Sequence, residues 1–173
     1  MVKSPTSKNV KKIILTKKIT SEISLIKSRH NLNDVSKKCI LYILQNDNIY
    51  DEIIDYIDGC ILERISPELK NNREIVSAAI IQSFELEFDF ALPKFQNDKN
   101  LILYFARCNK LDLEYVPEQF KDDKDIVLAA INQIPKINTA KFLKEASLKL
   151  QNDKKFLIEC YKINSFIKEF IKK

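Results

Sequence analysis

Apolar residues recur every three to four positions along most of this chain, which is the spacing of one face of an α-helix. In the clearest segment, the pair Ile126/Val127 is followed one turn later by the pair Ala130/Ile131. A shorter apolar stripe at i, i+3 and i+7 comes before each such helix. The pattern predicts an all-α fold in which short and longer helices alternate.

A polar motif separates the two kinds of stripe, and it reads apolar, any, Asn/Asp, Asn/Asp, base, any, apolar, apolar. Its four copies begin at Leu69, Phe95, Phe120 and Leu150, and an incomplete fifth copy begins at Leu44. Asn and Asp side chains accept hydrogen bonds from the free N–H groups of a first helical turn. Each copy therefore predicts a helix start, with capping boxes expected at Asn71/Glu74 and Asp122/Asp125.

Proline and glycine mark where these helices are short or end. Pro67, Pro93 and Pro117 lie within the short stripes, where proline fits a first turn or breaks a helix. Short, partly 3₁₀ elements are therefore expected there. Gly59 is the only glycine of the 173 residues, and we expect it to end the first long helix in a left-handed conformation.

The motif spacing defines a two-helix unit of about 25 residues in four to five copies. A unit this small cannot bury its own apolar face, so neighbouring copies must stack. We therefore expect tandem repeats stacked into a short α-solenoid or helical array, forming one domain over residues 21–173. Residues 1–20 are expected to be a flexible basic tail.

The units resemble the domain-of-unknown-function family numbered 4116. Phe120-Lys-Asp-Asp-Lys-Asp-Ile-Val-Leu-Ala-Ala-Ile carries the family pattern best, and the resemblance covers residues 60–163. It implies a helical repeat module without an assigned activity, and it transfers no catalytic residue.

Positive charge is concentrated at the N-terminus. The first 20 residues hold six lysines and no acid, whereas the remaining 153 residues hold 23 bases and 24 acids. A charge run of this kind is usually a solvated end, and the alternative is a helix that binds a nucleic acid or an anionic membrane surface. The residues that would bind such a polyanion are Lys8, Lys11, Lys12, Lys17 and Lys18.

The residues that most enzymes need are scarce. One histidine and one glycine argue against triads, phosphate loops and strained nucleophile turns. The four cysteines lie far apart and form no C-x-x-C pair, so we expect buried apolar thiols in a reducing compartment and no metal site. Asp122 and Asp123 are interpreted as cap and surface residues, and no catalytic residue, cofactor or small-molecule substrate is expected.

The segment from Ser83 to Phe90 alternates strictly between apolar and polar residues, which mimics a β-strand. The repeat phase favours a loop and a short helix with Phe88 in the core. The alternative is an exposed aromatic and acidic patch, formed by Phe84, Phe88 and Phe90, that docks a protein partner.

These observations predict a non-enzymatic protein-interaction or scaffold module, with polyanion binding through the lysine tail as the alternative. The longest apolar runs are six residues, far short of a membrane span. A soluble protein, most simply cytoplasmic, is expected, with organelle targeting or delivery into a host cell left open.

Overall fold

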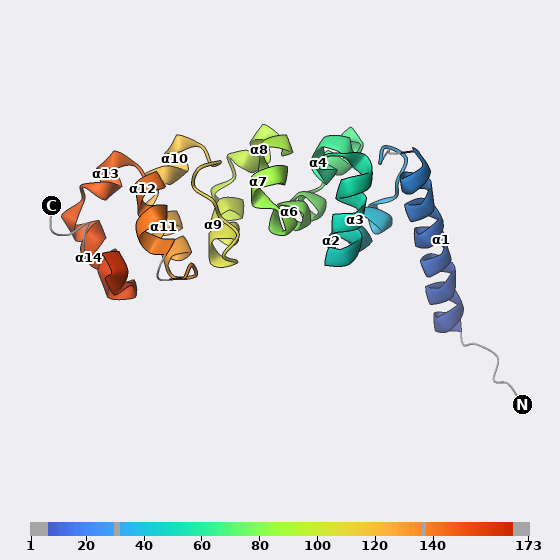
Figure 1. Cartoon of the computed structure of the whole chain (residues 1–173), viewed down its shortest axis with the longest axis horizontal. Coiled ribbons are helices and arrows are strands. Elements are labelled where there is room, and N and C mark those ends of the chain that lie inside the picture. Colours follow the sequence, from blue (N-terminus) through green and yellow to red (C-terminus); the bar gives the residue numbers. More distant parts are fainter. Residues whose placement is uncertain (1–6, 30–31, 136–137, 168–173) are drawn as a thin grey trace, which may run out of the picture. The chain divides into compact units, whose positions relative to one another are not determined.

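The computed structural model describes residues 7–29, 32–135 and 138–167, and these residues are mostly helical with no β-strand (Figure 1). The predicted all-α class is confirmed. The described chain divides into two compact units, residues 1–82 and 83–173. That residues 21–173 form a single array stays a prediction.

The first unit begins with three helices, which are followed by two one-turn helices and a further helix of ten residues. Its elements are α1 (Ser7–Arg29), α2 (Lys37–Leu44), α3 (Asp47–Ile57), α4 (Ile61–Arg64), α5 (Pro67–Lys70) and α6 (Arg73–Gln82). Helices α1, α2 and α3 pack on one another, and α6 packs on α2. The core of this unit is aliphatic, with Ile40, Ile53 and Ile75 fully buried.

The second unit repeats one arrangement three times, a one-turn helix followed by a longer helix. Its elements are α7 (Phe84–Glu87), η1 (Phe88–Phe90), α8 (Pro93–Gln96), α9 (Lys99–Arg107), α10 (Glu118–Lys121), α11 (Lys124–Ile131), α12 (Thr139–Glu145), α13 (Leu148–Gln151), α14 (Lys154–Ile163) and η3 (Ser165–Ile167). Figure 1 shows the one-turn helices α8, α10 and α13 along one edge of this unit and the longer helices α9, α11 and α14 along the other. Helix α11 packs against both α9 and α14.

The predicted helix starts are confirmed, and the capping residue is the second polar residue of each motif. The Asp98 Oδ1 accepts hydrogen bonds from the backbone N–H groups of Asn100 and Leu101 at 2.9 and 3.1 Å. Asn72, Asp123 and Asp153 cap α6, α11 and α14 in the same way.

The predicted capping boxes are wrong by one position. Asn71 and Asp122, the first polar residues of their motifs, lie at the C-terminal ends of the one-turn helices α5 and α10. A cap at Asn72 or Asp123 places Glu74 and Asp125 at the second helical position. The third position, which a capping box needs, holds an isoleucine in both helices.

The incomplete fifth motif also begins a helix, α3. Asn46 lies at its N-cap but makes no side-chain cap hydrogen bond, and its Nδ2 donates to the Tyr42 carbonyl at 2.6 Å instead. This copy keeps the helix start and lacks the cap.

Helix α3 ends at an aspartate, and not at the glycine that the sequence analysis favoured. Asp58 has the left-handed conformation, with φ 50°, whereas Gly59 has no positive φ. Aspartate tolerates this conformation because its short side chain can hydrogen-bond locally. A Cβ at Gly59 would lie 3.0 Å from Glu63 Oε2, so glycine leaves room here for the side chains of α4.

The short elements predicted around the prolines are confirmed. Pro67 and Pro93 lie in the first turns of α5 and α8, and Pro117 is the N-cap residue of α10. Each of these helices is four residues long. Proline fits these positions because a first turn does not use its missing N–H group.

Candidate functional site

The aromatic segment forms α7 and η1, so residues one turn apart share a face. Phe84 and Phe88 are buried, and their rings stack with centroids 4.6 Å apart. Phe84 also meets the ring of Phe105 edge-on at 5.8 Å. Phe84 and Phe88 are therefore not part of an exposed patch, because the hydrophobic core holds both rings.

The opposite side of this segment is exposed. We call Glu85, Leu86, Asp89 and Phe90 the α7 face. Leu86 is 51% exposed and Phe90 is 44% exposed, so the third aromatic residue of the predicted patch does reach the surface. Tyr115 Oη donates a hydrogen bond to Glu85 Oε1 at 3.0 Å, and this bond raises the pKa of Tyr115 to about 12.

The predicted lysine tail belongs to a helix. From Ser7 onwards it forms the start of α1, which continues without a break past residue 20 to Arg29. Lys17 and Lys18 are exposed, whereas the side chains of Lys8, Lys11 and Lys12 lie outside the described residues. Among the helices that the structure describes, none combines the length and apolar character needed to cross a membrane.

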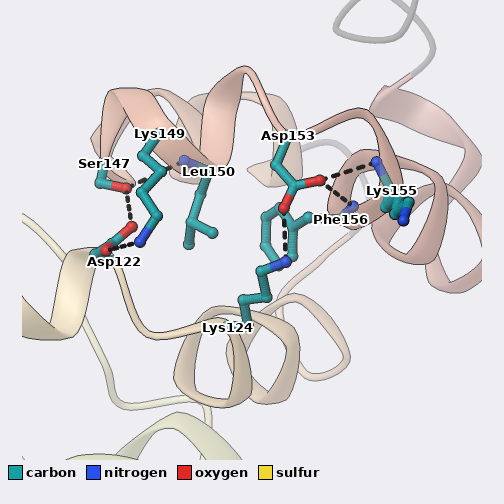
Figure 2. A network of polar contacts seen from close by, with 8 residues as sticks. All are labelled: Asp122, Lys124, Ser147, Lys149, Leu150, Asp153, Lys155 and Phe156. Atoms are coloured by element: carbon teal, nitrogen blue, oxygen red, sulfur yellow. Dashed lines mark hydrogen bonds and ion pairs between the residues drawn. The ribbon is translucent and has the colours of Figure 1, made fainter.

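A ladder of lysine–aspartate contacts joins successive repeats in the second unit. The first lysine of α9, Lys99, lies 2.6 Å from the Asp123 carboxylate that caps α11. Likewise Lys124, the first residue of α11, lies 2.6 Å from the Asp153 carboxylate that caps α14. Figure 2 shows Lys124 reaching Asp153, which also faces the backbone of Lys155 and Phe156. Lys99 and Lys124 thus each serve the helix of the following repeat.

In two of the motifs, the first polar residue makes a second contact with the next repeat. Asn97 Oδ1 accepts a hydrogen bond from Gln119 Nε2 of α10 at 3.0 Å. Asp122 accepts hydrogen bonds from Ser147 Oγ and Lys149 Nζ, both at 2.7 Å, and Figure 2 shows the two donors on either side of the carboxylate. Ser147 also caps α13 by accepting from the Leu150 N–H at 3.2 Å.

These contacts keep the ladder charged. The hydrogen bond from Lys149 lowers the pKa of Asp122, and the hydrogen bond from Lys124 lowers the pKa of Asp153. The same pairing raises the pKa of Lys124, and the hydrogen bond to Asp123 raises the pKa of Lys99. The paired aspartates Asp122 and Asp123 are therefore engaged in cap and ladder contacts, as the sequence interpretation held.

Three of the four cysteines are buried as predicted. Burial raises the pKa values of Cys39 and Cys160 to about 12, which keeps both as thiols at neutral pH. Cys108 is the exception, because it lies at the exposed C-terminal end of α9. His30 lies outside the described residues, and no cluster of three or more metal-ligating side chains occurs among those described.

One polar hollow of about 400 Å³ opens between the end of α9 and helix α12. Asp112, Lys141 and Glu145 line it together with apolar residues such as Leu111 and Phe142. Burial raises the pKa of Glu145, and the nearby Asp112 carboxylate adds to this effect. Carboxylates with one lysine make the hollow a charged surface feature, and the described lining supplies no nucleophile paired with a base.

The architecture defines a class: an all-α protein whose tandem helices are capped and linked by a repeating polar motif. A family model described as Domain of unknown function (DUF4116) matches residues 48–96 and 98–139. The two matches cover more than half of the chain, so the chain belongs to this family. The predicted family resemblance is confirmed.

The matched segments differ from the predicted extent of residues 60–163. The first match covers nearly all of α3 and the whole of α6, and the second covers α9 and α11. The unit of the family model thus spans two of the shorter units defined by the motif, and α13 and α14 lie beyond it. No curated protein and no solved structure matches the chain.

Proposed function

We propose that this protein is a non-enzymatic interaction or scaffold module whose helical repeats stack into a short α-solenoid and present the α7 face to a protein partner. The observation that carries the proposal is that one short segment has a buried side and an exposed side. Phe84 and Phe88 anchor it in the core, whereas Leu86 and Phe90 are exposed and each directly follows an exposed acid, Glu85 or Asp89. Apolar and aromatic side chains held on an anchored element are the usual centre of a protein interface.

The stacking is supported by the order of contacts in the second unit. Helix α11 packs against α9 before it and α14 after it, and each junction has a lysine–aspartate rung. Contacts between successive copies are the arrangement that defines a solenoid. A non-enzymatic role agrees with the use of Asp122 and Asp123 in ladder contacts and with the raised pKa of Cys39.

Co-purification from the native source tests the proposed interface. The tagged full chain is compared with the double variant Leu86→Ser/Phe90→Ser and with Leu148→Ser, a control in which an apolar residue that is 74% exposed is removed elsewhere. We expect partners that survive high salt to be lost with the double variant and kept with the control. Unchanged recovery of the same partners by the double variant would reject the α7 face.

A second candidate is a polyanion binder that acts through α1. It is favoured by the lysine-rich, acid-free start of the chain and by the exposure of Lys17 and Lys18 on a helix. Binding of this kind weakens steeply as salt is raised. Deletion of residues 1–20 should then abolish retention on heparin, and undiminished retention would dismiss this candidate.

A further inference from the structure

The ladder marks one face of each capped helix as the side that meets the next repeat. Lys99 of α9 and Lys124 of α11 both reach forward to a cap aspartate. Residues four and seven positions after such a lysine lie on the same face, because the helical period brings them into line. In α9 and α11 these residues are Leu103, Ala106, Leu128 and Ile131, and all four are buried or half-buried.

Helix α14 carries the same face, and there the residues that the structure describes leave it exposed. Its lysine is Lys154, and the residues four and seven positions later are Ile158 and Tyr161, which are 46% and 38% exposed. η3 packs on α14 and leaves these two residues exposed. Lys154 forms no ion pair with the residues that the structure describes, in contrast to Lys124.

We propose that the face of α14 formed by Lys154, Ile158 and Tyr161 docks a further helical repeat, carried by a partner chain, whose helix begins with an aspartate cap. The inference rests on the proposed interaction function and names a second surface and the chemistry of its occupant. The established junctions of α9 with α11 and of α11 with α14 supply the geometry, since this face continues them.

Charge selects the occupant. Lys154 and Lys155 lie together at the start of α14, so two copies of this face that pack in parallel would bring like charges together. A cap aspartate supplies the opposite charge, as Asp153 does for Lys124. At the existing junction Lys124 also lies over the Phe156 ring, 5.8 Å from its centroid, so an apolar residue three positions after the cap completes the match.

A tandem duplication tests the fit with a probe of known sequence. A second copy of residues 132–161 is inserted directly after Tyr161 of the full chain, which repeats the spacing between α11 and α14. Hydrogen exchange is then followed by mass spectrometry. We expect backbone amides of the inserted capped helix to exchange at least about tenfold more slowly than those of an unfolded chain, as docked helices do.

The matched control carries the same insertion together with Ile158→Lys and Tyr161→Lys in the original α14. Both substituted side chains are exposed, so α14 itself should remain protected while the inserted helix loses its protection. An inserted helix that exchanges at the unfolded rate without the substitutions, or that stays protected with them, would overturn the proposal.

Sedimentation of the unmodified chain tests whether a second copy of this chain occupies the face instead. A dimer that Tyr161→Lys abolishes would assign the face to a second copy of this chain and overturn the proposal, whereas an unchanged monomer supports a different partner. These readouts depend on Ile158 and Tyr161, whereas the α7 face is tested at Leu86 and Phe90. The two proposals can therefore fail separately.

Discussion

Lys124 Nζ lies 2.6 Å from a carboxylate oxygen of Asp153, and the same carboxylate caps the helix that follows. One aspartate thus caps the N-terminus of α14 and also binds a lysine of α11. The positive end of the helix dipole and the lysine both favour the charged carboxylate. This double use explains why an acid and a base stand side by side in the motif.

Removing the cap of α11 should destabilise the fold. Asp123→Ala deletes the acceptor for the Asp125 and Ile126 N–H groups and is expected to lower the free energy of unfolding by about 1 kcal/mol. Asp123→Asn keeps an acceptor oxygen, so its free energy of unfolding should fall by less. Denaturant titration followed by circular dichroism measures both, and an unchanged midpoint for the alanine variant would contradict the assigned cap.

The rung between Lys124 and Asp153 should be electrostatic and sensitive to salt. Lys124→Met keeps the aliphatic stem and removes the charge, so its denaturation midpoint should fall at low salt and approach that of the wild type at high salt. A double-mutant cycle with Asp153→Asn isolates the pair. Additive effects of the two substitutions at low salt would mean that the contact contributes nothing.

Acid should weaken the ladder. The folded-state pKa values of Asp122 and Asp153 are lowered, so each contributes stability that is present above the unfolded pKa. That contribution is lost as the pH falls from about 4, the ordinary aspartate value, through the lower folded values. Unfolding midpoints measured from pH 7 to pH 2 should decline less steeply for Asp122→Asn than for the wild type; parallel curves would refute the coupling.

The two sides of the aromatic segment should respond differently to truncation. Phe88→Ala removes a buried ring that stacks on Phe84, and about 3–5 kcal/mol of unfolding free energy should be lost. Phe90→Ala removes an exposed ring and should change stability by less than about 0.5 kcal/mol. Thermal or denaturant unfolding measures both variants. If the two lose equal unfolding free energy, Phe90 also belongs to the core.

The cysteines should differ in reactivity towards a thiol-alkylating reagent. Cys108 is exposed and should be modified first, whereas Cys39, Cys60 and Cys160 are buried and should react only on unfolding. Peptide mass spectrometry of the native and denatured chain distinguishes the sites. Rapid modification of Cys39 in the native protein would contradict its burial and raised pKa.

The sequence predicted the helix starts because capping is local. A cap aspartate and the N–H groups that it binds lie within three residues, so their spacing is visible in the motif itself. The motif lysine had no assigned role, because Lys99 and Lys124 find their partners in the following repeat, which only packing brings near. Phe84 was misplaced for a related reason, since alternation does not reveal which side of a short helix meets Phe105.

The end of α3 shows a different limit. Glycine is the usual residue for a left-handed turn, yet Asp58 adopts it and Gly59 makes room for α4. That choice depends on where Glu63 and Arg64 lie, which no local pattern records.

The rungs described above also bear on how the second unit folds. The side-chain contacts from Asn97 to Gln119, from Asp122 to Ser147 and from Lys124 to Asp153 close loops of 22, 25 and 29 positions along the chain. Short loops cost little entropy to close, and low contact order goes with fast folding. Assembly can therefore begin at any junction and spread to its neighbours, without waiting for the two ends of the chain to meet.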